Sequence, residues 1–293
     1  MSAAALALVF AAALLHASWN VVAKKTGGDA RFALMAALLL VVIWAPLGLW
    51  AAWRAVPLWG AVEWTVLLAS AIVHVFYFTT LLRGYRRSDL TVVYPVARGS
   101  GPLLASLGAI VWFGESMSAV AAAGVGGVVL GVFFIAGGPG LWSKAHDPVQ
   151  RGRVRAGIGW GAATGALIAG YTLIDGYAVK VLLISPILVD YVGNLFRVPF
   201  LLPSALRDRR GFGALWRAQW RAALVIAVLG PLGYVLVLYA MTLAPLSHVA
   251  PAREVSMLFA ALLGGRLLGE GDRASRLLGA ACIAGGVAAL ALG

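Results

Sequence analysis

Charged residues are scarce in this 293-residue sequence, where they make up 12% of the positions. A typical soluble domain carries roughly 25%. Hydrophobic residues make up 62%, and the mean hydropathy is +0.92. So little charge could not cover the surface of a globule in water. The composition therefore excludes an ordinary soluble protein and requires an apolar phase around the chain.

Cysteine is nearly absent, because Cys282 is the only one. A single cysteine excludes an intrachain disulfide framework and a cysteine-rich metal site. The sequence also lacks the glycine spacing of a phosphate-binding loop, and its histidines do not have the spacing of metal ligands. These histidines are His16, His74, His146 and His248. We therefore expect no cofactor, no metal and no enzymatic activity.

Acidic residues are also few, since 11 Asp and Glu stand against 23 Lys and Arg, for a net charge of +12. Such an excess occurs in proteins that bind nucleic acid or anionic lipid. Here the positions of the basic residues are better explained by membrane topology, as shown below. We therefore expect no nucleic-acid partner.

The sequence is instead rich in apolar runs of the roughly 20 residues that a membrane-spanning helix needs. Ten such runs are predicted as helices, at 3–22, 32–53, 62–82, 90–113, 117–136, 156–178, 184–204, 222–243, 247–268 and 276–292. Only Met1 and Ser2 precede the first run, so it lacks the basic start of a cleaved signal peptide. The longest connections, 137–155 and 205–221, are too short to build a core. The predicted fold class is all-α integral membrane, with ten transmembrane helices.

Lysine and arginine are concentrated at one end of these helices. Of the 23, 18 fall in the odd-numbered connections, and only Arg54 and Lys180 fall in the even-numbered ones. The remaining three lie inside helices. Cytoplasmic loops collect Lys and Arg, so the odd connections are predicted to face the cytoplasm. Both termini are then predicted on the periplasmic side of a bacterial inner membrane.

The two halves of the chain resemble each other. Arg98 and Arg253 both follow a proline in a predicted helix, and they are 155 positions apart. The pairs Gly114-Glu115 and Gly269-Glu270 have the same offset, and we interpret both glutamates as markers of a helix-ending turn. Lys24 and Lys180 match at an offset of 156. These matches predict an internal duplication.

The duplication predicts a first five-helix repeat at 1–136, a cytoplasmic linker at 137–155 and a second repeat at 156–293. An odd number of helices in each repeat requires the two copies to be inverted relative to each other. Inverted repeats are typical of secondary transporters, in which the substrate binds between the repeats near the middle of the membrane. We therefore expect alternating access to a central cavity.

The segment LLHASWNVVAKK, the proline-then-arginine helices and the Gly-Glu turns together resemble the drug/metabolite transporter superfamily, in its ten-helix, EamA-type branch. The resemblance covers essentially the whole chain. It implies a transporter of small organic solutes made of two duplicated halves. Within the superfamily, the chain is most similar to the bacterial aromatic amino-acid exporters.

Three cations and three carboxylates lie inside the predicted helices: Arg98, Arg197, Arg253, Asp175, Asp190 and Glu254. A charge in the bilayer core costs about 3 kcal/mol on insertion scales, so it usually faces a cavity or a partner. Structural ion pairs between helices are one explanation, and a substrate site is the other. On the seventh helix, the spacing of Asp190, Asn194 and Arg197 favours an intrahelical chain of polar contacts.

The predicted substrate-binding residues share helix faces at three- and four-residue spacing. They are His16, Trp19, Asn20, His74, Tyr77, Phe78, Tyr94, Arg98, Tyr171, Asp175, Tyr234, Arg253 and Glu254. The arginines suit a carboxylate or a phosphate, the acidic residues suit an ammonium group, and the aromatic rings suit an aromatic side chain. Ordinary packing between helices is the alternative for each ring.

The sequence thus predicts a transporter that exports small amino acids, aromatic ones preferred, with lipid and solute as its partners. Alternative substrates are cationic drugs, nucleosides and other metabolites, and a non-transporting scaffold or receptor is the alternative of another class. Without an ATP site, an ion or a counter-solute would drive transport. His16 and His74 are candidate proton carriers because histidine titrates near neutral pH. The oligomeric state stays open, a monomer included.

Overall fold

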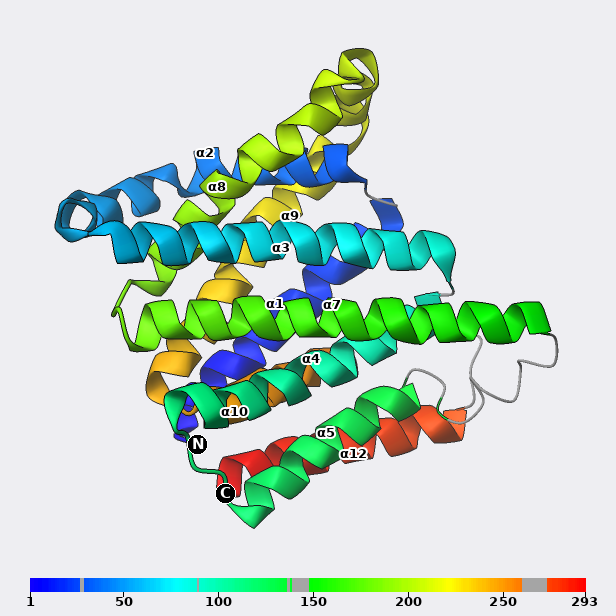
Figure 1. Ribbon diagram of the computed structural model, residues 1–293. Coiled ribbons are helices and arrows are strands. Elements are labelled where there is room, and N and C mark those ends of the chain that lie inside the picture. Colours follow the sequence, from blue (N-terminus) through cyan, green and yellow to red (C-terminus); the bar gives the residue numbers. More distant parts are fainter. Residues whose placement is uncertain (27–28, 89, 136–137, 139–147, 260–272) are drawn as a thin grey trace.

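The computed structural model describes residues 1–26, 29–88, 90–135, 138, 148–259 and 273–293, which form a bundle of helices without strands (Figure 1). The helices are α1 (Ala3–Thr26), α2 (Ala30–Ala55), α3 (Ala61–Arg87), α4 (Leu90–Phe113), α5 (Ala119–Ile135), α7 (Pro148–Lys180), α8 (Pro186–Leu206), α9 (Arg209–Leu243), α10 (Leu246–Ala252) and α12 (Arg273–Leu292). Two 3-10 turns, η1 (Val56–Leu58) and η2 (Arg253–Val255), follow α2 and α10. The ten described helices correspond one to one with the predicted spans.

Most of these helices meet the physical requirements for crossing a bilayer. Seven of the described helices are long and apolar enough: α1, α2, α3, α4, α7, α9 and α12. Helix α5 is apolar but has only 17 residues. Polar residues of α8 reduce its hydropathy, and η2 interrupts the helix that begins with α10. The predicted all-α membrane fold is confirmed.

Helix packing follows an approximate two-fold pattern between the halves. If α1 to α5 are matched in order with α7, α8, α9, α10 and α12, several of the largest contacts between the halves follow this pattern. Helix α1 packs on α9, and its counterpart α7 packs on α3. Three further pairs join a helix to its own counterpart: α2 with α8, α4 with α10, and α5 with α12. The fold therefore consists of two inverted five-helix repeats.

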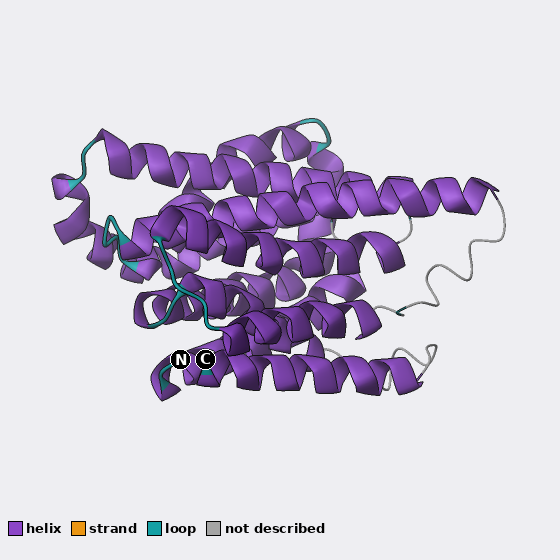
Figure 2. Cartoon of the chain, turned by 60° about the horizontal axis from the view of Figure 1, so that its bottom comes forward, coloured by secondary structure: helices purple, strands orange, loops and turns teal. Residues whose placement is uncertain are grey.

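The first and last described residues lie at the same end of the bundle (Figures 1 and 2). The amino group of Met1 donates a hydrogen bond to the carbonyl oxygen of Ala291 at 2.8 Å. The turns between α2 and α3, α4 and α5, α7 and α8, and α9 and α10 lie at this end as well (Figure 1). The two termini therefore lie on the same side, as they must in a chain that crosses the membrane ten times.

Two predicted connections are shorter than expected. Helix α9 begins at Arg209, so the prediction of a connection at 205–221 is wrong for most of its length. Asp208 starts this helix by accepting a hydrogen bond from the Gly211 N–H at 2.8 Å. A search for apolar runs misses this stretch because it is rich in arginine and tryptophan. Helix α7 likewise begins at Pro148, ahead of the predicted residue 156, which shortens the predicted linker.

Glycines allow the closest helix contacts. A Cβ atom added at Gly131 of α5 would lie 2.6 Å from the carbonyl oxygen of Gly279 in α12. In α7, a Cβ atom at Gly161 would lie 2.9 Å from the carbonyl oxygen of Val93 in α4. Small residues at four-residue spacing let helix backbones approach in this way. These glycines therefore serve packing within the bundle.

Candidate functional site

A buried carboxylate, Asp175 of α7, lies at the centre of a polar cluster between the halves. Its side chain receives hydrogen bonds from the Ser70 hydroxyl of α3, at 2.5 Å, and from the Tyr234 hydroxyl of α9. His74 joins the cluster through its Nδ1 atom, 2.9 Å from the Ser70 carbonyl oxygen. No Lys or Arg among the described residues forms an ion pair with Asp175, which is 1% exposed. Its hydrogen-bond partners are neutral, so the cluster can accept a cationic group.

Aromatic rings from three helices surround this carboxylate. The His74 ring stacks on the Tyr171 ring with their centroids 3.9 Å apart. Tyr77 meets the edge of Tyr171 at 5.6 Å, and Tyr234 meets His74 at 6.1 Å. Phe78 makes no ring contact with another described residue. The structure thus brings together the predicted rings of α3, α7 and α9, with the exception of Phe78.

Helix α1 presents a second group of predicted residues. The rings of His16 and Trp19 are in edge contact at 4.9 Å, and the Asn20 amide donates a hydrogen bond to the His16 carbonyl oxygen at 2.8 Å. Helix α1 also packs against η2, the turn that carries Arg253. The α1 residues therefore lie on a helix next to one of the two symmetry-related arginines.

Arg98 of α4 is neutralised by a carboxylate of the other half. Its Nη2 atom lies 2.9 Å from Oε2 of Glu254, and the two side chains are 12% and 2% exposed. The same nitrogen donates a hydrogen bond to Ser256 Oγ at 3.1 Å, and the guanidinium lies 6.0 Å from the centre of the Tyr94 ring. Arg98 is therefore occupied by its ion pair. The sequence predicts two equivalent arginines for a substrate, and only Arg253 remains unpaired among the described residues.

Arg253 is the open cation of this region. Its side chain makes no ion pair or hydrogen bond with another described residue. It lines a cavity of about 10 Å³ between α4, α7 and α10, together with Glu254 and Thr172. A cavity of this size is at the lower limit for one water molecule. Thr172, which also lines the cavity, lies one helical turn before Asp175 on α7. The cavity beside Arg253 therefore reaches the turn of α7 next to this buried carboxylate.

The other two charges inside the helices, Asp190 and Arg197, are linked through Asn194 along α8. The Asn194 amide donates a hydrogen bond to Asp190 Oδ1 at 3.0 Å, and Arg197 Nη1 donates one to Asn194 Oδ1 at 3.3 Å. This is the intrahelical chain that the spacing predicts. It gives these three residues a structural role within α8.

The helix that carries Arg253 is broken at the site. Helix α10 ends at Ala252, the chain forms the 3-10 turn η2, and helical structure resumes at 256–259. A 3-10 turn within a helix is often a functional hinge, and interrupted helices are common at the binding sites of transporters. The sequence analysis missed this break, although Pro251 is a signal for it because proline removes a helical hydrogen bond.

A further polar contact, also missed by the sequence analysis, lies at the end of the bundle that carries the termini. Glu115 follows α4, and its carboxylate forms an ion pair with Lys180 Nζ at 2.7 Å. The carboxylate also accepts hydrogen bonds from the backbone N–H groups of Leu246 and Ser247, both at 2.8 Å. Its interpretation as a mere turn marker is therefore incomplete. We call Glu115, Lys180, Leu246 and Ser247 the Glu115 latch.

The latch holds Glu115 in its ionised form. Burial alone would raise the pKa of this carboxyl group, but the hydrogen bonds from Lys180 and from the α10 backbone bring the pKa below its usual value. The signal available in the sequence was that Glu115 and Lys180 both end helices on the same predicted face. The counterpart Glu270 lies outside the described residues, as does the side chain of Lys24.

Sequence comparison agrees with the duplication seen in the fold. The model of the EamA-like transporter family matches residues 3–137 and again residues 155–292. The chain belongs to the EamA-like transporter family. Members of the EamA-like family are membrane transporters of the drug/metabolite type, so this is a multi-pass membrane transporter that carries a small molecule. No curated protein matches the chain significantly.

A solved crystal structure shares this EamA-like architecture. It aligns over 100% of this chain and 98% of its own length, with a TM-score of 0.73 at 18% sequence identity. At this identity, the likeness concerns the fold alone. It supports the arrangement of the helices from one end of the chain to the other.

Proposed function

We propose that the protein exports small amino acids, with a preference for aromatic ones, by alternating access through the region between the repeats. The observation that carries this proposal is that the bundle interior holds an open cation, Arg253, and, near it, the buried carboxylate Asp175 beside stacked aromatic rings. A zwitterion with an aromatic side chain has a matching group for each of the three.

Each group then has a distinct role. The guanidinium of Arg253 binds the substrate carboxylate, since arginine forms strong charge-assisted hydrogen bonds with carboxylates. Asp175 binds the ammonium group, and rings such as Tyr171 pack against the substrate side chain. The ion pair of Arg98 and Glu254 holds α4 against η2 and orders the site. The other rings and amides of the predicted set would line the path: Trp19, Asn20, Tyr77, Phe78, Tyr94 and Tyr234.

The Glu115 latch supports alternating access. It joins the turn after α4, in the first repeat, to α7 and α10 of the second. In this conformation the repeats are therefore tied together at the end that carries the termini, which we propose faces the periplasm. Release of substrate on that side would require the latch to open. Coupling to a proton would use His16 or His74. His74 contacts Ser70, which donates to Asp175, and His16 lies on α1, which packs against η2.

Export of cationic drugs is a second candidate function. The buried Asp175 has only neutral hydrogen-bond donors, and rings stack next to it. A lipophilic cation would use the carboxylate and the rings and would leave Arg253 without a role. The two functions therefore make opposite predictions for an Arg253 variant.

The decisive experiment measures flux of labelled tryptophan and of tryptamine, which lacks the carboxylate, in proteoliposomes. Loss of a charge-assisted contact costs about 1.5–3 kcal/mol, so Arg253→Gln should lower tryptophan flux at least tenfold and leave tryptamine flux unchanged. Arg207→Gln, an exposed arginine at the opposite end of the bundle from the termini, is the matched control. Equal losses for both solutes would remove Arg253 from carboxylate binding. Flux of a cationic dye without amino-acid flux would favour the drug exporter, and no flux at all would favour a scaffold.

A further inference from the structure

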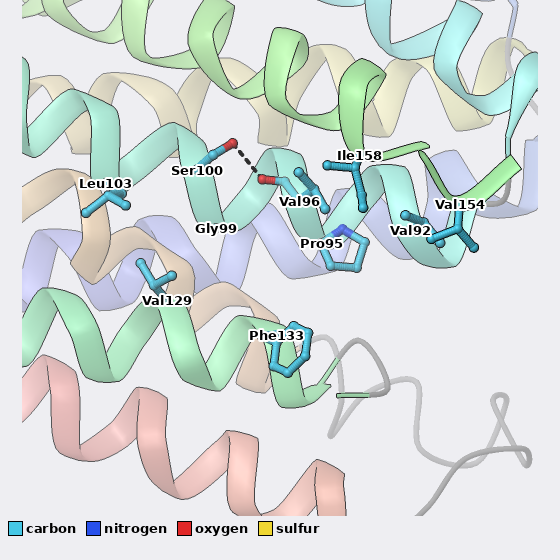
Figure 3. Close-up of a pocket in the computed structure, with 10 residues that line it drawn as sticks. All are labelled: Val92, Pro95, Val96, Gly99, Ser100, Leu103, Val129, Phe133, Val154 and Ile158. Atoms are coloured by element: carbon cyan, nitrogen blue, oxygen red, sulfur yellow. Dashed lines mark hydrogen bonds between the residues drawn. The ribbon is translucent and has the colours of Figure 1, made fainter. Parts of the chain in front are cut away.

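A groove with an apolar wall lies away from the central site, between α4, α5 and α7 (Figure 3). Its cavity has a volume of about 270 Å³. The lining residues are Val92, Pro95, Val96, Gly99, Ser100, Leu103, Val129, Phe133, Val154 and Ile158. Ser100 is the only one with a polar side chain, and its hydroxyl donates to the Val96 carbonyl oxygen at 2.6 Å. The wall therefore offers no free hydrogen-bonding side chain to a ligand.

The groove opens on the lipid-facing surface of the bundle. The lining residues Leu103, Val129 and Phe133 are partly exposed, and their neighbours Leu104 and Leu130 are 39% and 55% exposed. In a membrane transporter, exposed leucines of this kind face acyl chains. An apolar cavity beside them is matched to a hydrocarbon chain and poorly matched to a zwitterionic solute.

Two arginines lie on the face of α7 that lines this groove, beyond the end of the groove. Arg151, Val154, Arg155 and Ile158 follow the i, i+3, i+4, i+7 spacing of one helix face, so two arginines extend the face that carries two lining residues. Both arginines are exposed. Basic pockets between membrane helices bind anionic lipid head groups.

We propose that this groove binds an anionic glycerophospholipid, with an acyl chain between α4 and α5 and the phosphate at Arg155. The groove supplies the apolar contact, and the arginine face supplies the charge that a zwitterionic lipid would not need. The site is separate from Arg253 and Asp175, so lipid binding does not depend on the proposed substrate.

Glycine substitutions give a matched pair of variants. A Cβ atom at Gly99 would meet only Val129 Cγ1, at 3.8 Å, so Gly99→Leu should fold while filling the groove. Gly126, on α5, has no atom within 4 Å of an added Cβ and does not line the groove. Gly126→Leu therefore adds the same side chain without filling the site. Arg155→Gln tests the charge, with the exposed Arg83→Gln as its control.

The test is retention of phosphatidylglycerol against phosphatidylcholine by the purified full chain in detergent, quantified by native mass spectrometry. The wild-type chain should retain phosphatidylglycerol preferentially, and loss of one arginine contact should weaken retention about fivefold. Gly99→Leu should abolish the preference, while Gly126→Leu and Arg83→Gln should keep it. Equal retention of both lipids, or retention unchanged in Gly99→Leu and Arg155→Gln, would overturn the proposal. Displacement of the lipid by free tryptophan would assign the groove to the substrate instead, and also overturn it.

Discussion

Lys180 Nζ lies 2.7 Å from Glu115 Oε1, and this ion pair joins the end of α7 to the turn that follows α4. The same carboxylate accepts two backbone hydrogen bonds at the start of α10. One side chain of the first repeat thus holds two helices of the second.

Glu115→Gln should loosen the closed end of the bundle. Glutamine keeps the shape but loses the charge, and hydrogen bonds that involve a charged group contribute about 1.5–3 kcal/mol each. We expect a lower melting temperature and faster labelling of a cysteine introduced at Ser247. Glu63→Gln is the control, since Glu63 accepts a hydrogen bond from Gly60 N at the start of its own helix and links no repeats. Equal effects of the two substitutions would contradict a gating role.

The latch should depend on pH in a defined direction. The folded-state pKa of Glu115 lies below the usual value, so its stabilisation is fully present above the unfolded-state pKa of about 4.3. That stabilisation is lost as the pH falls through the lower folded-state pKa. We expect the wild-type melting temperature to fall more steeply than that of Glu115→Gln below this pH.

Asp29 provides the internal comparison for the pH experiment. It lies at the opposite end of the bundle, and hydrogen bonds from the Phe32 backbone and the Arg31 side chain outweigh the effect of burial, so its pKa is also lowered. Labelling of a cysteine introduced at Ser247 should become faster as the pH falls through the folded-state pKa of Glu115. An Asp29→Asn variant should retain this acid-dependent labelling, because Ser247 belongs to the latch. Loss of this dependence in Asp29→Asn would show that the pH response arises elsewhere.

Arg98→Gln should destabilise the fold more than a combined Arg98→Gln and Glu254→Gln variant. The single change leaves the Glu254 carboxylate buried without its cation, and breaking such a pair costs about 3–5 kcal/mol. Neutralising both partners removes the uncompensated charge. Melting temperatures of the wild type, both single variants and the double variant provide the test. Additive losses would show that the two side chains do not form a coupled pair.

Gly131→Ala should separate α5 from α12. The added Cβ atom would lie 2.6 Å from the Gly279 carbonyl oxygen, so the backbones would have to shift. Overpacking of this kind costs about 1–3 kcal/mol. Gly126→Ala, on the same helix with open space around it, should be neutral or slightly stabilising because alanine favours helix. Similar melting temperatures for both variants would rule out the close contact.

Hydropathy predicted the helices better than it predicted their ends. A run of apolar residues marks the part of a helix inside lipid, and that is why the ten spans could be placed from the sequence. It does not mark the helical residues outside lipid, so the Arg- and Trp-rich start of α9 at Arg209 was assigned to a connection. The duplication was visible because Arg98 and Arg253 keep their offset, and it predicted the inverted pairing of helices.

The chemistry of the site was harder to predict than its location. Sequence spacing placed His74 and Tyr77 on one face, and tertiary structure brought that face against Tyr171. Spacing within helices could not show that Glu254 pairs with Arg98, because the partners are far apart in the chain. Nor could it assign Glu115 to an ion pair with Lys180, since each position alone is an ordinary helix end.

The 3-10 turn at Arg253–Val255 provides a way for winding to change the site. A 3-10 turn advances about 120° per residue and an α-helix about 100°. Rewinding three residues into α-helix would therefore rotate the segment that begins at Ser256 by about 60° and draw it in by about 1.5 Å. Ser256 would turn away from Arg98, while the helix axis would move little. A screw motion of one segment would then remove this partner of Arg98 without tilting a whole repeat.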